Sequence, residues 1–373
     1  MNVRSVTVND WPSRYELLDG LRGVAALGVV LHHLGVVEDG HFAVMVFFVI
    51  SGYCITASAE SCRRDGLGFR QFMVRRIKRI YPPYLLAIAF FSLTRGVKAA
   101  MGGQNDLQRP VLDWVQNLTL TQWISNAFHP ISWPSDNPHL FVTAFWSLNY
   151  EEQFYLIMAI ALTIATNRRI PLIAPVVLLA TIGLAWNFSI PGNWICGFFI
   201  EYWVHFALGA CLYFALCVFT DWRSRLAFVA GVLLLGLASA ARLMPWTATT
   251  AQDLRSMVEL AFLSFATLGL FFLRPLSPVV SRSMMWRPIA ALGTISYSLY
   301  LIHQFNLNLV ASIAQRVLPG GVPRFVLIMT MAGLHVGLAT LFWYACERPF
   351  LSKKAAPGPI ISGAVDAARA ACR

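Results

Sequence analysis

Two ionisable side chains stand eleven residues apart in the first apolar stretch of the chain, LLDGLRGVAALGVVLHHLG. On a helix, His33 would lie within about 20° of the direction of Arg22 and about 16.5 Å further along the axis, whereas His32 would point about 80° away. A neutral imidazole suits proton transfer near pH 7, and a guanidinium suits anion binding. We therefore expect Arg22 and His33 to face one interior crevice. The spacing leaves open an alternative, in which Arg22 pairs with Asp19 and the histidines bond neighbouring helices.

A pair of carboxylates interrupts a second apolar stretch, FWSLNYEEQFYLI, between Trp146 and Tyr155. Adjacent residues of a helix point about 100° apart, so at most one of Glu151 and Glu152 can face a given partner. Arg22 is one candidate partner, and a hydrogen-bond network within a helix bundle explains the pair equally well. Weaker candidates of the same kind are Glu201, His205 and Glu259.

Basic residues cluster in a third segment, FRQFMVRRIKRIYPPY. Arg75 and Arg79 are four residues apart, and Arg76 and Arg79 are three apart, so a helix would present them as a forked surface suited to phosphate oxygens. The alternative is an anchor that sets topology and contacts lipid headgroups.

The elements that position these residues are expected to be membrane-spanning helices. Of the 373 residues, 57% are hydrophobic and 13% are charged, about half the charged share of an average soluble domain. The mean hydropathy is +0.60. The net charge of +11 is explained by basic cytoplasmic loops, so nucleic acid is not an expected partner. The seven cysteines have no metal-ligand spacing, so neither a metal site nor a structural disulfide is expected.

The apolar stretches predict an all-α, polytopic membrane protein of about ten transmembrane helices. The predicted spans are 17–36, 42–59, 74–94, 141–165, 170–187, 197–219, 225–242, 256–273, 288–311 and 323–346.

The basic residues also predict how the chain is oriented. With the N-terminus in the cytoplasm, 21 of the 29 Lys and Arg residues fall on inside segments and 7 on outside segments, which predicts that both termini are cytoplasmic. We expect a cytoplasmic N-terminal segment at 1–16, one transmembrane domain at 17–349 and a disordered cytoplasmic tail at 350–373. The long loop at 95–140 would lie outside and could cover a site.

Taken together, these segments resemble the acyltransferase 3 family of integral-membrane O-acyltransferases, which modify O-antigen, exopolysaccharides and Nod factors in bacteria. LDGLRGVAALGVVLHH resembles the opening helix of the family, with Arg22 and His33 as its Arg-x10-His pair. The segments that resemble other family motifs are VFFVISGYCI around Ser51, RRIKRIYPPY, WSLNYEEQFY, SYSLYLIHQ with His303, and the ERP that begins at Glu347.

The resemblance implies a multi-pass enzyme of the bacterial cytoplasmic (inner) membrane, with no permanently bound cofactor. Its donor would be cytoplasmic acyl-CoA, most simply acetyl-CoA, and its acceptor a sugar hydroxyl of a cell-surface polysaccharide or of a lipid-linked precursor. His33 would be the general base or a transient acyl carrier, acting with Arg22 and Glu151. Arg75, Arg76 and Arg79 would bind the CoA phosphates. Supporting residues would be Asp19, Ser51, Trp146, Glu152, Tyr155, His303 and Glu347.

A secondary transporter or flippase of a glycan or anion is the alternative class, because buried Arg, His and Glu can also couple proton movement to transport. Transporter halves often show internal repeats, and none is visible in this sequence. The oligomeric state is left open.

Overall fold

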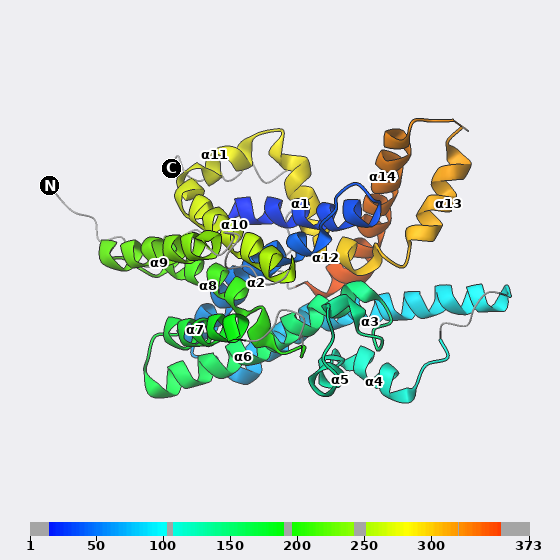
Figure 1. Cartoon of the computed structure of the whole chain (residues 1–373). Coiled ribbons are helices and arrows are strands. Elements are labelled where there is room, and N and C mark those ends of the chain that lie inside the picture. Colours follow the sequence, from blue (N-terminus) through cyan, green and yellow to red (C-terminus); the bar gives the residue numbers. More distant parts are fainter. Residues whose placement is uncertain (1–14, 103–106, 190–195, 242–250, 320, 352–373) are drawn as a thin grey trace.

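The computed structural model describes residues 15–102, 107–189, 196–241, 251–319 and 321–351, which form helices joined by short loops (Figure 1). The segments predicted at the two ends, 1–16 and 350–373, lie almost entirely outside the described residues. The α-helices are α1 (Glu16–His33), α2 (Gly40–Arg64), α3 (Phe69–Ala100), α4 (Val111–Thr119), α5 (Trp123–Phe128), α6 (Trp146–Arg168), α7 (Ile173–Ser189), α8 (Trp203–Cys217), α9 (Trp222–Ala241), α10 (Ala251–Leu273), α11 (Ser277–Arg282), α12 (Trp286–Ile302), α13 (Leu307–Val317) and α14 (Arg324–Phe342).

The all-helical prediction is confirmed in the described part of the chain. Five helical segments there are long and apolar enough to cross a membrane: Gly40–Arg64, Phe69–Ala100, Trp222–Ala241, Arg255–Arg282 and Arg324–Phe350. Two shorter apolar helices are Ile173–Trp186 and Trp203–Cys217. Ten spans and cytoplasmic termini therefore remain predictions.

One predicted span differs from the structure. The stretch 288–311 is not a single helix, because α12 ends at Ile302 and α13 begins at Leu307 after a turn. Gln304 in that turn accepts a hydrogen bond from the Ala144 amide at 2.8 Å and donates one to the Thr143 hydroxyl at 3.1 Å. Its side chain ties the turn to the segment that precedes α6, and the chain changes direction there.

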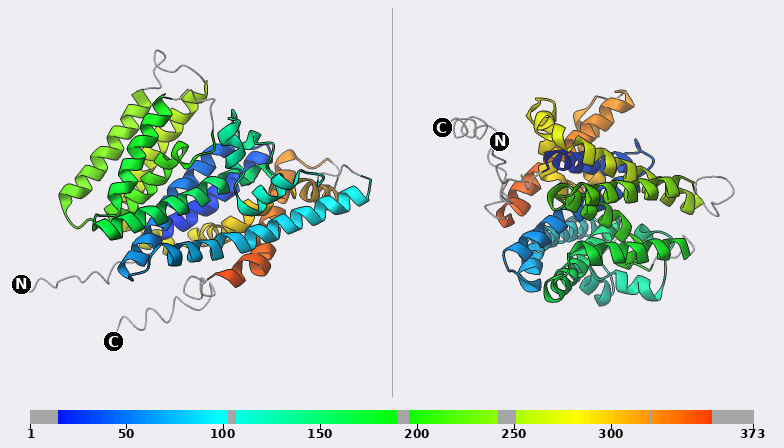
Figure 2. Two further views of the ribbon diagram at one scale, coloured as in Figure 1. Left: turned by 90° about the horizontal axis from the view of Figure 1, so that it is seen from below. Right: turned by 90° about the vertical axis from the view of Figure 1, so that its left-hand side faces the viewer.

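Glycines allow the central helices to cross at very short distance. A Cβ atom on Gly52 of α2 would stand 1.9 Å from the carbonyl oxygen of Phe206 in α8, and one on Gly209 would stand 1.7 Å from that of Val49. A Cβ on Gly293 of α12 would likewise stand 1.8 Å from the carbonyl oxygen of Asp19 in α1. Small residues at such crossings let helix backbones approach each other inside a membrane. Figure 2 shows α1 and α2 in the middle of the molecule, with α7 to α10 on one side and α13 and α14 on the other.

The long loop predicted at 95–140 starts later than expected, because α3 continues to Ala100, and its described residues include α4 and α5, which lie beside α3 (Figure 1). Buried Asn117 connects its two ends: its amide donates to the carbonyl oxygens of Asp113 and His139 at 2.7 Å each and accepts from the Phe141 amide at 3.0 Å. The imidazole of His139 also bonds the Asp113 carboxylate at 2.8 Å. These bonds hold the segment around His139 against α4.

The crossing of α2 and α8 generates a stability prediction. Gly209→Ala forces a methyl group against the Val49 carbonyl, and overpacking of this kind costs about 1–3 kcal/mol. We expect a clearly lower midpoint of thermal unfolding in detergent. The matched control is Gly231→Ala in α9, where a Cβ would meet no described atom within 4 Å and the melting temperature should be unchanged or higher. Equal melting of both variants would contradict the assigned contact.

Candidate active site

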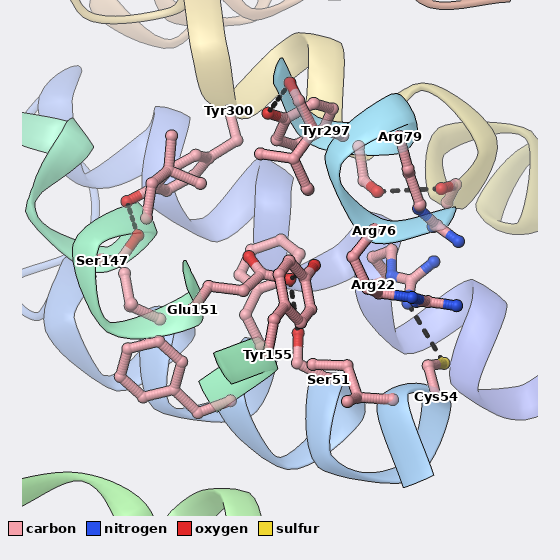
Figure 3. Close-up of a pocket in the computed structure, with 18 of the residues that line it drawn as sticks. Arg22, Ser51, Cys54, Arg76, Arg79, Ser147, Glu151, Tyr155, Tyr297 and Tyr300 are labelled. Atoms are coloured by element: carbon pink, nitrogen blue, oxygen red, sulfur yellow. Dashed lines mark hydrogen bonds between the residues drawn. The ribbon is translucent and has the colours of Figure 1, made fainter. Parts of the chain in front are cut away.

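A cavity of about 90 Å³ lies between α1, α2, α3, α6 and α12, and we call it the arginine cavity (Figure 3). Its charged and polar lining consists of Arg22, Ser51, Cys54, Arg76, Arg79, Ser147, Glu151, Tyr155, Thr294, Ser296, Tyr297, Tyr300 and Glu347. Segments that are far apart in the sequence therefore supply one polar interior surface. Figure 3 shows the guanidinium groups of Arg22, Arg76 and Arg79 together on one side of it.

The predicted group of three arginines in α3 is divided by the structure. Arg76 and Arg79 line the cavity, whereas Arg75 donates to the sulfur of Cys62 at 3.4 Å and does not line it. Neighbouring residues of a helix point about 100° apart, which explains why Arg75 and Arg76 separate. The guanidinium of Arg76 lies over the ring of Tyr155 at 5.9 Å, and its Nε atom is buried without a hydrogen-bond partner among the described residues.

The adjacent carboxylates of α6 face different partners, as their spacing predicts. Glu151 points into the arginine cavity, where it accepts hydrogen bonds from the Tyr155 hydroxyl at 2.6 Å and the Ser51 hydroxyl at 3.3 Å. Glu152 instead accepts a hydrogen bond from Tyr81 of α3. The site carboxylate is therefore Glu151, and Glu152 connects α6 to α3.

Arg22 faces Glu151 across the same cavity, and its guanidinium donates to the sulfur of Cys54 at 3.4 Å. Glu347, at the end of the π-helical turn η6 (Trp343–Glu347), also lines the cavity and accepts from the Ser298 hydroxyl at 2.5 Å. The ERP segment that begins at Glu347 thus reaches the same cavity as Arg22 of α1.

A second pocket of about 440 Å³ contains His33, and we call it the histidine pocket. Its lining residues are Val29, His32, His33, Glu38, Asp39, Gly40, His41, Val44, Trp133, Pro134, Ser135, Asp136, Thr143, Ala144, Trp146, Arg255, Tyr300 and Gln304. Residues 133–136 of the predicted long loop thus form part of its wall. Trp146 lies here and not in the arginine cavity.

Imidazole rings surround His33. Its ring centre lies 5.0 Å from that of His303 and 5.1 Å from that of His32. Among the described residues no hydrogen bond joins His33 to a carboxylate. His303 is fully buried, with Nδ1 2.8 Å from the Tyr300 carbonyl, and His32 is held through Nδ1 by the Val37 carbonyl at 3.0 Å. The predicted supporting residue His303 therefore does contact His33.

Arg22 and His33 do not share a single crevice, so that expectation is wrong in detail. Arg22 lines the arginine cavity and His33 lines the histidine pocket, and the side chains of Val44 and Tyr300 belong to the walls of both. The two spaces adjoin along α1, with one residue of the predicted pair at each. The Tyr300 hydroxyl is fixed by Ser147 at 2.7 Å, which holds its ring between them.

The sequence analysis did not identify His41, which lines the histidine pocket. Its Nδ1 atom lies 3.0 Å from the carboxylate of Glu259 in α10, and its ring stacks on Trp146 with 5.4 Å between the ring centres. Glu259 was only a weak candidate from its sequence, and a histidine at the start of a helix does not by itself indicate a functional residue. Their pairing depends on contacts between α2 and α10 that no local pattern predicts.

Asp39 caps α2 beside this histidine. Its carboxylate accepts the amides of His41 and Phe42 at 2.9 and 3.2 Å and the Nε of Arg255 at 2.9 Å. Burial opposes ionisation of Asp39, but the hydrogen bonds from Arg255 and from the Phe42 amide outweigh it and hold its pKa below the ordinary value. The guanidinium of Arg255 also lies 5.0 Å above the ring of Trp133. Among the described residues, no group of His, Cys, Asp and Glu is arranged to hold a metal ion.

Fold and site together define an all-helical chain with helices able to cross a membrane and two adjoining polar pockets in its interior. The chain belongs to the acyltransferase 3 family, since the family model described as an acyltransferase domain matches residues 15–344.

Among curated relatives, the chain is 26% identical to O-acetyltransferase OatA of Staphylococcus aureus, over 90% of this chain and 57% of the relative. It is 35% identical to the putative peptidoglycan O-acetyltransferase YrhL of Bacillus subtilis, over 39% of this chain and 23% of the relative. The chain thus spans little more than half the length of OatA. No solved structure is significantly similar to it.

Removing the Tyr155 hydroxyl tests the network around Glu151. Tyr155→Phe deletes the 2.6 Å bond to that carboxylate, and hydrogen bonds to charged groups contribute about 1.5–3 kcal/mol. We expect the free energy of unfolding in detergent to fall by about that amount. Tyr344→Phe, at an exposed tyrosine of η6, is the control and should leave it unchanged. A variant as stable as the unaltered protein would show that Glu151 does not depend on this bond.

Proposed function

We propose that the chain is a membrane O-acyltransferase that moves an acyl group, most simply acetyl, from cytoplasmic acyl-CoA to a sugar hydroxyl of a bacterial cell-surface glycan. The observation that carries this proposal is the contact between two unlike pockets. A cavity with three arginines adjoins a pocket with His33, and only Val44 and Tyr300 are common to both walls.

The arginine cavity suits the donor. Acyl-CoA carries phosphate groups at one end and the thioester at the end of a long pantetheine arm. Arg22, Arg76 and Arg79 outnumber the cavity carboxylates Glu151 and Glu347, and guanidinium forks match phosphate oxygens. Arg79 is exposed, so it can meet the phosphates at the surface, while Arg22 and Arg76 are partly buried. Arg75 lies beside Cys62, outside the cavity, and would contact the phosphates of acyl-CoA at the surface.

The histidine pocket suits the acceptor reaction. Attack of a hydroxyl on a thioester requires removal of the alcohol proton, or prior transfer of the acyl group to a carrier, and a neutral imidazole can do either. His33 is one of two imidazoles that α1 contributes to this pocket, and unlike His32 its ring is not bonded to the Val37 carbonyl. The helical rise from Arg22 to His33 is about 16.5 Å, which an extended pantetheine arm can cover in large part.

The family and the relatives' names support a glycan as the acceptor class. The family resemblance favours exopolysaccharide or lipopolysaccharide as the acceptor, and the name of the relative YrhL includes peptidoglycan. We propose a glycan of the cell surface or its lipid-linked precursor, modified at the cytoplasmic (inner) membrane. Mass spectrometry of peptidoglycan and of surface polysaccharide, with and without the gene, tests this directly. Loss of the acetyl mass increment from one fraction supports the proposal and names the acceptor, and unchanged spectra for both contradict it.

His33 is the first residue to test within this proposal. His33→Ala removes the reacting imidazole, and we expect glycan acetylation to fall by about 100-fold or more. The control is His32→Ala, whose ring lines the same pocket but is held by the Val37 carbonyl, and it should retain most activity. Normal acetylation by a well-expressed His33→Ala protein would exclude both roles of His33.

Arg22 tests the donor site. Arg22→Lys keeps the positive charge but loses the planar fork, so we expect weaker binding of acetyl-CoA, by about tenfold, and a raised KM for the donor. Isothermal titration of the purified protein with acetyl-CoA measures the change. Arg64→Lys, at the exposed end of α2, is a matched control that lies outside the cavity. Unchanged donor affinity in Arg22→Lys would remove Arg22 from the donor site.

A further inference from the structure

A second imidazole stands in the wall of the histidine pocket, with a carboxylate behind it. His41 lines the pocket and Glu259 does not, although Glu259 lies 3.0 Å from Nδ1 of His41. The His41 side chain is 14% exposed and that of Glu259 is 5% exposed. The imidazole of His41 therefore faces the pocket, and the carboxylate of Glu259 lies behind it.

Neighbouring groups hold the His41 ring in one orientation. Trp146 stacks on it with an angle of 10° between the ring planes, and Trp133 meets it edge-on with 5.6 Å between ring centres. The His41 amide donates to the carboxylate of Asp39 at 2.9 Å, which fixes the backbone that carries the ring. A side chain locked by packing and by hydrogen bonds is prepared for one reaction geometry.

Of the three histidines that line the pocket, His33 and His41 differ in the groups that surround their rings. A carboxylate on one nitrogen fixes the tautomer and the orientation of an imidazole that acts as a base. His41 has such a carboxylate, whereas His33 is bordered by the imidazoles of His32 and His303. When Nδ1–H of His41 donates to Glu259, Nε2 holds the free electron pair. Its neighbour is the Tyr202 hydroxyl at 3.3 Å, a long contact, and a substrate hydroxyl in the pocket must displace Tyr202 to bond Nε2.

Charged and titratable groups face His41 from each element around it. Arg255 of α10 bonds Asp39 and lies 3.7 Å from Glu259, so its charge is shared between two carboxylates. Among the described residues, the groups near His41 include Asp39, Tyr202, His205, Arg255 and Glu259.

We propose that His41, oriented by Glu259, is the general base that takes the proton of the acceptor hydroxyl, which assigns the carrier role to His33. This inference rests on the proposed function and separates the two roles, base and acyl carrier, that the proposed function leaves open for His33. First, a ring nitrogen of His33 bonds to the acyl carbon, the carbon–sulfur bond breaks, and the ring N–H proton goes to the CoA sulfur. Then the sugar oxygen bonds to the acyl carbon, its proton moves to Nε2 of His41, and the bond to His33 breaks. The proton on His41 returns to His33, so both rings are restored.

Chemical rescue tests this assignment. Membrane vesicles carrying His41→Ala are supplied with acetyl-CoA and with surface glycan from a strain that lacks the gene. We expect acetyl transfer to fall by about 100-fold or more, and added imidazole to restore part of it, because a diffusible base fills the space left by the ring. Acetyl-CoA affinity should be unchanged. Glu259→Gln should lower the transfer rate in the same direction, with a smaller loss.

A matched control separates a catalytic role from a structural one. His129→Ala removes an exposed histidine outside the pocket and should retain activity. Full activity of His41→Ala, or a loss that imidazole does not restore in a protein that still binds acetyl-CoA, would overturn the proposal for His41. Failure of the unaltered protein to transfer acetyl at all would instead contradict the proposed function.

Discussion

The cost of placing charged groups in an apolar helix bundle is the constraint on which this structure depends. Arg22 has the sulfur of Cys54 as its hydrogen-bond acceptor, and Glu151 has the hydroxyl of Ser51 as one of its donors. Ser51 and Cys54 stand on either side of Gly52, where α2 crosses α8 with backbone in contact. The glycine crossing therefore sets the position of the groups that make the buried charges tolerable.

Much of the arginine cavity could be predicted from sequence because charge is rare in this chain. Arg22 and Glu151 interrupt apolar stretches, and the cost of exposing a charge to lipid predicts that both lie in the interior. Helical spacing also predicts that Glu151 and Glu152 face different partners, and they do. It does not decide which arginine of α3 faces inward, because Arg75 and Arg76 both lie at helical spacing from Arg79.

The histidine pocket was less accessible to sequence analysis. Glu259 and His41 are 218 residues apart, and their contact exists only because α10 packs near the start of α2. Trp133 reaches the pocket from a long loop whose conformation depends on the buried bonds of Asn117. The break between α12 and α13 was also missed, because Gln304 acts there through contacts with the segment before α6. Local patterns identify helices and buried charge, and tertiary contacts decide which polar groups share a pocket.

The wall between the two pockets has a consequence for the membrane itself. Polar spaces reached from opposite sides of a bilayer would form a path for protons if water could join them. Val44 contributes an apolar side chain to this wall, and Tyr300 contributes a ring whose hydroxyl is already bonded to Ser147 and to the Ala144 carbonyl. Both of these bonds engage the Tyr300 hydroxyl within the protein. Val44 and Tyr300 therefore separate two polar spaces that would otherwise be continuous inside the helix bundle.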